Sequence, residues 1–181
     1  MSEFQLYPKL KHYNPNYSVS YFNKEVYVTE KIHGSNFQVC ITVNADGEIT
    51  EYLYGRRTGF ISSDENFFGH TKNMVKYEKK LKALAYYLGE GTTIIYGEYY
   101  GGNLDGKKME GCFRVQNSSF ANYCEDNRFA IFDIYHNGKC ETWEKTKTYC
   151  RSFDLTHVPE LVSGKFPDIL IGINVNSMKS V

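Results

Sequence analysis

Apolar positions in this chain either alternate with polar ones or form short unbroken runs, and both patterns are typical of β-strands. Strands are therefore predicted over residues 26–29, 37–43, 48–54, 92–96 and 129–135. Asp46-Gly47 and Asn137-Gly138 are sequences that favour tight hairpin turns. The first turn should join 37–43 to 48–54, and the second should lead from 129–135 back into 139–143.

A helical pattern follows the first hairpin. Apolar residues recur at the spacing of a core-facing helix at Met74, Tyr77, Leu81, Leu84 and Leu88. Ser62 and Glu65 have the spacing of a capping box, which predicts that the helix begins beside them. We interpret the lysine run first as a solvated face and second as a surface for RNA phosphates; it comprises Lys72, Lys76, Lys79, Lys80 and Lys82.

The remaining segments are less regular. A short helix is predicted over 144–153. Residues 1–20 are expected to form an extended arm that packs on the domain, and residues 101–127 to form a polar, irregular loop. Glycine stands on both sides of Arg56 and Arg57, so these arginines are expected on an adaptable loop.

Composition narrows the class of protein. The 181 residues are enough for a single domain over 1–181 with its own core. Lys plus Arg and Asp plus Glu both number 21, and this zero net charge does not favour nucleic-acid binding, although a local basic cleft remains compatible with it. Five cysteines without a Cys-x-x-Cys pair predict reduced thiols. Without a signal-peptide core or a membrane-length apolar run, we expect an intracellular protein of the cytoplasm or nucleus, not secreted and not bound to a membrane.

The candidate chemistry lies in residues 29–37, Thr-Glu-Lys-Ile-His-Gly-Ser-Asn-Phe. A lysine nucleophile must lose its proton, which is rare at neutral pH unless burial or a neighbouring cation such as Arg56 or Arg57 lowers its pKa. His33 and Asn36 can bind phosphate oxygens or orient Lys31. An ordinary exposed lysine at the end of a strand, followed by a turn at Gly34, accounts for the same residues without chemistry.

Two later strands carry further candidates. Glu98 follows Gly97 at the end of an apolar strand, where a carboxylate is costly unless it is bonded, and a ribose hydroxyl would be a suitable partner. Phe132 lies in a buried strand, where core packing is the simpler interpretation of an aromatic residue. Alternation predicts that Ala130 and Phe132 share one face of that strand, with Ile131 and Asp133 on the other.

Residues 30–37, Glu-Lys-Ile-His-Gly-Ser-Asn-Phe, resemble the nucleotide-attachment motif of the RNA ligase 2 and RNA-editing ligase family of covalent nucleotidyltransferases. Further segments resemble later motifs of that family, in the family's order. These are Arg56-Arg57-Thr58-Gly59, Tyr96-Gly97-Glu98 (with Tyr96 in place of the usual Phe), 129–134 and 159–166. The resemblance covers roughly residues 25–170.

The resemblance implies an α+β fold, an ATP-grasp-like nucleotidyltransferase domain with twisted, mainly antiparallel sheets around a nucleotide cleft. It implies an ATP-dependent RNA ligase in which Lys31 takes AMP from ATP as lysyl-AMP, passes it to an RNA 5′-phosphate, and lets a 3′-hydroxyl displace AMP to seal the RNA ends. Nucleotide binding is implied for Glu30, Ile32, His33, Asn36, Arg57, Glu98 (ribose) and Phe132 (adenine). Mg²⁺ would bridge the phosphates mainly through water, and no residue is assigned as a metal ligand.

Two later family motifs have no counterpart, so the domain is expected to be incomplete at its C-terminus. One is a Glu-Gly motif that ends in lysine, and the other is a Lys-x-Lys strand. Because nucleotidyl transfer depends on cationic stabilisation, their loss should be close to disabling. The chain is then a piece of a longer ligase, a weak or inactive paralogue that binds nucleotide or RNA, or a ligase whose missing groups come from a second chain. An mRNA guanylyltransferase is a further alternative, against which the His-Gly-Ser-Asn-Phe sequence argues.

Overall fold

The computed structural model describes residues 3–9, 23–117, 122–166 and 168–169. The chain forms two compact units. The larger unit consists of residues 1–7 and 32–157, and the smaller of residues 8–31 and 158–181. One domain over residues 1–181 stays a prediction.

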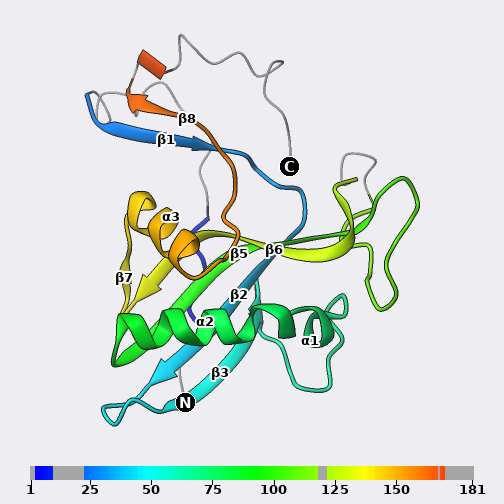
Figure 1. The fold of residues 1–181 in the computed structure, drawn as a ribbon, viewed down its shortest axis with the longest axis horizontal. Coiled ribbons are helices and arrows are strands. Elements are labelled where there is room, and N and C mark those ends of the chain that lie inside the picture. Colours follow the sequence, from blue (N-terminus) through cyan, green and yellow to red (C-terminus); the bar gives the residue numbers. More distant parts are fainter. Residues whose placement is uncertain (1–2, 10–22, 118–121, 167, 170–181) are drawn as a thin grey trace. The chain divides into compact units, whose positions relative to one another are not determined.

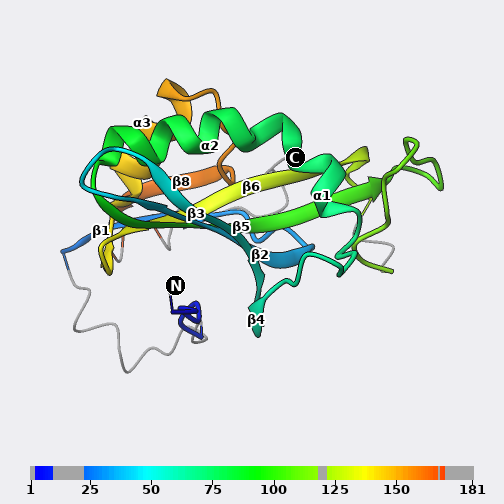
Figure 2. The ribbon, with the colours of Figure 1, turned by 90° about the horizontal axis from the view of Figure 1, so that it is seen from below.

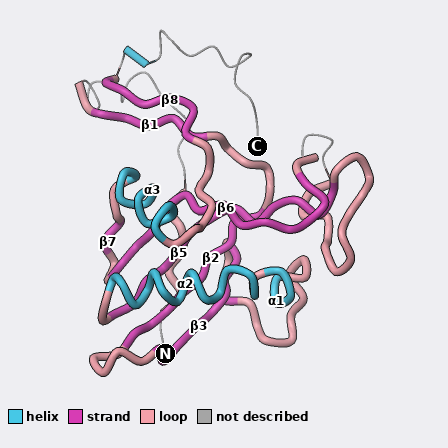
Figure 3. Tube along the Cα trace, viewed as in Figure 1, coloured by secondary structure: helices cyan, strands magenta, loops and turns pink. Residues whose placement is uncertain are grey.

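The larger unit is built on a six-stranded antiparallel sheet of order β4-β3-β2-β5-β6-β7 (Figures 1 and 3). Its strands are β2 (Ser35–Val43), β3 (Ile49–Arg56), β4 (Gly59–Phe60), β5 (Gly91–Asn103), β6 (Cys124–His136) and β7 (Lys139–Cys140). The predicted β2–β3 hairpin and the turn at Asn137-Gly138 are confirmed. The expected α+β composition with mainly antiparallel strands is confirmed as well.

Helices cover one face of this sheet, as Figure 2 shows for α2 and α3. The helices are α1 (His70–Asn73), α2 (Val75–Leu88) and α3 (Trp143–Ser152). Leu81, Leu84 and Ala85 of α2 are fully buried against the side chains of β2 that point to this face, which are Phe37, Val39, Ile41 and Val43. The predicted apolar stripe is therefore the core face of the helix.

The helix does not begin at the predicted capping box, and that prediction is wrong. The Glu65 N–H donates to the Ser62 carbonyl in an isolated turn at 3.0 Å, and the Glu65 carboxylate pairs with Arg56. The chain then turns again, because the Asn66 side chain accepts a hydrogen bond from the Gly69 N–H at 2.7 Å and Gly69 has a φ of 69°. Helical backbone starts only after this second turn.

The N-terminal segment, residues 3–7, lies on the opposite face of the sheet from α2 (Figure 2). Phe4 packs edge-on against Phe60 at 5.2 Å between ring centroids, and Tyr7 packs against Tyr96 at 5.0 Å. The Tyr96 hydroxyl donates to the Gln5 carbonyl at 2.9 Å. A packed arm without helix or strand is thus confirmed for residues 3–7, whereas most of 8–20 lies outside the described residues.

Two predicted loops are more regular than the sequence suggested. The arginine segment is a tight hairpin in which Arg56 ends β3 and pairs with Gly59 of β4, so the adaptable loop is wrong. Strand β5 extends to Asn103 and β6 begins at Cys124, so residues 101–103 and 124–127 of the predicted irregular loop are strand. The extension includes a bulge after Gly101, a residue whose φ of 86° glycine adopts without strain.

The smaller unit contains a two-stranded antiparallel ribbon, β1 (Glu25–Thr29) with β8 (Glu160–Lys165). Its register runs from Glu25 opposite Lys165 to Thr29 opposite Glu160, with an irregularity after Val28. The strand predicted over 26–29 is confirmed.

All five cysteines are free thiols, as predicted. Among the helices that the structure describes, none has the length and apolar character needed to cross a membrane.

Candidate functional site

The loop Ile32–Gly34 leads into β2 and is held by side chains from distant parts of the larger unit. The His33 N–H donates to the Tyr123 hydroxyl at 2.9 Å, and the Gly34 N–H donates to Glu98 Oε1 at 3.0 Å. The Gln116 side-chain amide donates to the Gly34 carbonyl at 2.6 Å. The backbone of this loop is therefore fixed by contacts with residues 64 to 90 positions further along the chain.

Gly34 is required here by close packing. A Cβ atom at this position would lie 2.3 Å from the Tyr99 carbonyl oxygen and 2.9 Å from the Tyr100 Cβ. Backbone cannot yield as a flexible side chain can, so any larger residue would push the loop away from β5. The glycine of the motif therefore lets the loop rest directly on the strand that carries Glu98.

Asn36, Glu98 and Ala130 form a row across β2, β5 and β6. The register places Asn36 opposite Glu98 and Glu98 opposite Ala130. Phe37 of β2 points into the core beneath α2, so Asn36 points to the other face because successive side chains alternate. An amide, a carboxylate and a small residue therefore line one stretch of the face opposite the helices.

A bulge in β6 brings Asp133 to the same face of the sheet as Phe132. Gly97 pairs with Ile131 and Tyr96 with Asp133, so Phe132 is the extra residue between them. Ala130 and Phe132 share the face opposite the helices, as predicted. The prediction that Asp133 shares a face with Ile131 is wrong, because Asp133 contacts Tyr7 beside Phe132, whereas Ile131 is in the core. Phe132 is only partly buried, and its ring centroid lies 5.0 Å from that of Tyr7.

Tyr7 connects the N-terminal segment to this face. Its hydroxyl donates a hydrogen bond to Asp133 Oδ2. Burial raises the pKa of Asp133, and the hydrogen bond from Tyr7 lowers it in part. Burial, followed by the neighbouring Asp133, raises the pKa of Tyr7, which therefore stays protonated and serves as a donor. The carboxylate of Asp133 is thus held in a half-buried aromatic setting beside Phe132.

The two arginines of the β3–β4 hairpin differ in their surroundings. Arg56 forms an ion pair with Glu65. Arg57 lies in the turn, is exposed, and makes no hydrogen bond or ion pair with the residues that the structure describes. Arg57 therefore keeps its charge available to an anion, whereas Arg56 has a partner within the fold.

Glu30 and Lys31 belong to the smaller unit. The Glu30 N–H donates to the Pro159 carbonyl at 2.8 Å, which anchors the residue before Lys31. The Lys31 side chain is exposed, whereas Ile32, the first residue of the larger unit, is 3% exposed. Two of the predicted site residues, Glu30 and Lys31, therefore lie in the smaller unit, and the other six lie in the larger one: Ile32, His33, Asn36, Arg57, Glu98 and Phe132.

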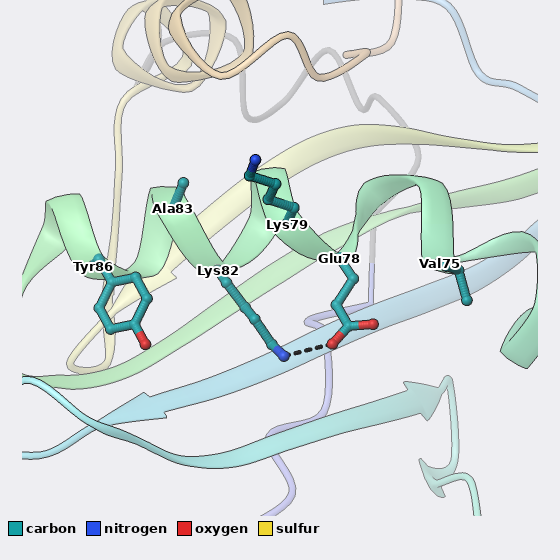
Figure 4. A pocket seen from close by; sticks show the side chains of 6 residues that line it. All are labelled: Val75, Glu78, Lys79, Lys82, Ala83 and Tyr86. Atoms are coloured by element: carbon teal, nitrogen blue, oxygen red, sulfur yellow. Dashed lines mark hydrogen bonds and ion pairs between the residues drawn. The ribbon is translucent and has the colours of Figure 1, made fainter.

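A shallow groove of about 500 Å³ lies elsewhere, on the outer face of α2 (Figure 4). It is lined by Val75, Glu78, Lys79, Lys82, Ala83 and Tyr86. Most lysines of this helix have partners in the fold: Lys76 pairs with Asp126, Lys80 with Asp154 and Lys82 with Glu78. These pairs favour the interpretation of the lysine run as a solvated face.

Residues that support the site were missed by sequence reasoning. Gln116 and Tyr123 lie in the segment whose role could not be read, and Tyr7 lies in the N-terminal arm. No spacing pattern marks them, because each reaches the site through tertiary contacts. Among the described residues, no group of three or more His, Cys, Asp or Glu side chains is placed to hold a metal ion.

Comparison with known proteins identifies the family to which these motifs belong. The model of the RNA ligase family matches residues 24–174 of this chain. RNA-editing ligase 2, mitochondrial, from Trypanosoma brucei brucei is 27% identical in an alignment of length 161 that covers 78% of this chain and 38% of that protein. The chain thus spans well under half the length of this curated relative.

Solved structures share the fold. An archaeal ATP-dependent RNA ligase (form 1) superposes with a TM-score of 0.57 at 16% identity, over 94% of this chain and 40% of that one. A putative ATP-dependent DNA ligase from Aquifex aeolicus gives a TM-score of 0.56 at 18% identity, over 90% of this chain and 39% of its own. The likeness shows that this chain shares the fold of these ligases over about two fifths of their length.

Proposed function

Because this chain belongs to the RNA ligase family, we propose that it forms the nucleotide-binding part of an ATP-dependent RNA ligase in which Lys31 carries AMP. The observation that carries the proposal is the hydrogen bond between the Gly34 N–H and Glu98. It joins the nucleotide-attachment motif to the glutamate motif of the family. The structure thus brings together residues that the sequence separates by 64 positions.

The roles proposed for the site residues follow from their chemistry. One oxygen of the Glu98 carboxylate accepts the hydrogen bond from the Gly34 N–H, and the carboxylate also accepts a hydrogen bond from a ribose hydroxyl. Phe132, on the face opposite the helices and only partly buried, offers its ring to adenine. Asn36 and His33 donate to phosphate oxygens, and exposed Arg57 supplies positive charge. Glu30 and Ile32, which flank Lys31, also bind the nucleotide in this proposal.

The proposed reaction has three balanced steps. The neutral amine of Lys31 attacks the α-phosphorus of ATP, a phosphorus–nitrogen bond forms, pyrophosphate leaves and the amine loses a proton. A 5′-phosphate oxygen of RNA then displaces the lysine, which takes a proton back, and leaves AMP joined to the RNA through a diphosphate. A 3′-hydroxyl finally attacks the 5′-phosphorus, loses its proton and releases AMP.

Magnesium would be held at this site mainly by the phosphates of the substrate and by water. Mg²⁺ would neutralise phosphate charge, and it usually keeps several waters and binds one or two protein carboxylates together with phosphates. The absence of a dedicated cluster of ligands among the described residues is compatible with that mode of binding. The chain's own contribution is to hold the nucleotide, to orient Lys31 and to place cations beside the phosphates.

Two alternatives have specific support. The two later family motifs have no counterpart in this sequence. The chain is then a nucleotide- or RNA-binding module without sealing activity, or a ligase that a second chain completes. An mRNA guanylyltransferase would use the same lysine with GTP in place of ATP.

Intact mass separates these possibilities. The protein is incubated with ATP and Mg²⁺, with GTP and Mg²⁺, or with neither nucleotide, beside Lys31→Ala and Phe132→Ala. An AMP adduct on the wild type, absent from Lys31→Ala and reduced in Phe132→Ala, is the expected result. Tyr86→Ala, an exposed aromatic on α2, serves as the matched control for Phe132→Ala.

Other outcomes would decide against the proposal. A GMP adduct without an AMP adduct would favour the guanylyltransferase. If a folded sample bound ATP but formed no adduct, the ligase proposal would be rejected in favour of a binding module without catalytic activity.

A further inference from the structure

Residues 104–117 form an excursion of turns and loop that follows β5 (Figure 3). The excursion carries exposed cations beside exposed apolar side chains. Lys107, Lys108 and Arg114 are exposed. Between them, Met109 and Phe113 are 54% and 41% exposed, although both are large apolar side chains. Basic side chains interleaved with an open aromatic ring are the surface that nucleic-acid strands bind.

The excursion is fixed in position. The Asn127 side chain accepts from the Phe113 N–H at 2.9 Å and donates to the Phe113 carbonyl at 2.8 Å. The Met109 N–H donates to the Glu125 carbonyl at 2.9 Å. These bonds tie the excursion to β6 and present the Phe113 ring in a set orientation.

The Phe113 ring is open on part of its surface. A Cβ atom on Gly69 would lie 2.7 Å from the ring, so one side rests on that glycine. Lys108 Nζ lies 5.9 Å from the ring centroid. A flexible lysine can swing from the ring to a neighbouring phosphate, which would leave the ring free for a base.

Charge is concentrated here. Asp105 and Glu110 are both exposed anions of the excursion, and the Asp105 carboxylate accepts a hydrogen bond from Asn122 at 2.6 Å. Lys72 of α1 adds a cation, because its side chain lies against Gly111. Cations thus outnumber anions on this surface, although the whole chain is neutral.

The excursion ends at the nucleotide loop. Val115 is tied to Gly101 of β5, and the next residue, Gln116, donates to the Gly34 carbonyl at 2.6 Å. Gly34 stands three positions after Lys31 in the sequence. A strand bound to the excursion would therefore approach the loop that follows the proposed AMP-carrying lysine.

We propose that Lys107, Lys108, Phe113 and Arg114 bind single-stranded RNA next to the end that receives AMP. The proposal rests on the proposed function for the identity of the strand. Phe113 stacks on an unpaired base, and the three cations bind the flanking phosphates. A paired base cannot offer its face to a side chain, so the open ring favours a single strand over a duplex.

The test is binding of a fluorescently labelled RNA of about 12 nucleotides, followed by anisotropy at several salt concentrations. Lys107→Ala/Lys108→Ala should weaken binding and reduce the slope of log K against log salt by about 1.4, because each phosphate contact to a single strand contributes about 0.7. Phe113→Ala should weaken binding about 5- to 100-fold. Phe113→Leu keeps apolar packing against Gly69 and should weaken binding similarly, which separates stacking from folding.

Lys79→Ala and Tyr86→Ala are the matched controls, since both residues are exposed on the outer face of α2. They should bind RNA as the wild type does. The proposal would be overturned if the Lys107, Lys108 and Phe113 variants bound RNA as tightly as the two controls. Tighter binding of a blunt RNA duplex than of the single strand would overturn it as well. So would binding that heparin competes for as well as RNA does, if Phe113→Leu also had no effect.

Failure of this proposal is distinguishable from failure of the proposed function. An AMP adduct on the wild type, with RNA binding unchanged in the Lys107, Lys108 and Phe113 variants, would support the ligase and contradict the RNA-binding surface. RNA binding that depends on these residues, without any AMP adduct on the wild type, would support the surface and contradict the ligase.

Discussion

Gly34 and Glu98 are joined by a hydrogen bond of 3.0 Å from the Gly34 N–H to Glu98 Oε1. A Cβ atom on Gly34 would also lie 3.0 Å from the Glu98 Cγ, so the two residues are in direct contact. The carboxylate therefore has a structural role in addition to the ribose contact proposed for it. The two roles can be separated by substitution.

Glu98→Ala should lower the free energy of unfolding by about 1–3 kcal/mol, because the Gly34 N–H loses its acceptor. It should also slow formation of the AMP adduct by about 100-fold or more. Glu98→Gln keeps an oxygen acceptor, so its stability should stay within about 1 kcal/mol of the wild type while adduct formation still falls. Urea unfolding and intact mass measure the two effects. Equal stability of the Ala and Gln variants would contradict the structural role.

Gly34→Ala should displace the loop from β5, because the new methyl group would meet the Tyr99 carbonyl at 2.3 Å. We expect a loss of about 1–3 kcal/mol of stability, as for other overpacked sites, together with loss of the AMP adduct. Gly59→Ala is the matched control, since nothing lies within 4 Å of a Cβ atom there. A Gly34→Ala variant as stable and as active as Gly59→Ala would show that the loop can move without consequence.

Tyr7→Phe should destabilise the larger unit at neutral pH by about 1–3 kcal/mol, because the buried Asp133 carboxylate loses its donor. Burial raises the pKa of Asp133, so this carboxyl binds its proton more tightly in the folded protein than in the unfolded chain. As the pH rises from the ordinary aspartate pKa through the raised pKa, Asp133 ionises in the folded protein and the free energy of unfolding decreases. The cost of Tyr7→Phe should shrink as the pH falls through that range.

Asp133→Asn tests the same pair from the other side. The variant keeps an oxygen acceptor for Tyr7 and removes the charge, so it should be more stable than the wild type at neutral pH and lose that advantage in acid. Tyr7→Phe should lower the free energy of unfolding less in the Asp133→Asn background than in the wild type. Urea midpoints between about pH 4 and pH 8 measure both effects, and pH-independent differences would exclude the titration of Asp133 as the cause.

His70 should make the protein less stable in mild acid. Its side chain is 2% exposed, packs edge-on against Phe37 and Tyr54, and leaves Nδ1 without a partner in the described structure. Burial lowers the pKa of His70, so the unfolded chain takes up a proton first as the pH falls through the ordinary histidine value of about 6.5. The stability contributed by neutral His70 is therefore present above that pH and is lost below it.

His70→Phe measures this effect, because phenylalanine suits the aromatic cluster and does not titrate. Between about pH 7 and pH 5, the urea midpoint of the wild type should decrease more steeply than that of His70→Phe. Parallel curves for the two proteins would mean that another group controls stability in this range.

Much of the fold could be read from local pattern. The strands 37–43 and 129–135, the helical stripe from Met74 to Leu88 and the turn at Asn137-Gly138 are confirmed, because alternation, helical period and turn residues are local properties of the chain. The family could be read as well, since residues 30–37 carry its motif. The start of the helix could not, because Phe67, Phe68 and His70 pack into the core and override the capping sequence at Ser62.

The sequence by itself determined the strands, the core face of the helix and the identity of the motif residues. Only the tertiary structure decided that Phe132 and Asp133 point to the same face, since that depends on a bulge against Tyr96 and Gly97. Only the tertiary structure brought Tyr7 to Asp133 and Gln116 to Gly34, because these contacts join residues 126 and 82 positions apart. Periodicity records which face of its own element a residue occupies, whereas a site is assembled from the pairing of distant elements, and no local pattern encodes that pairing.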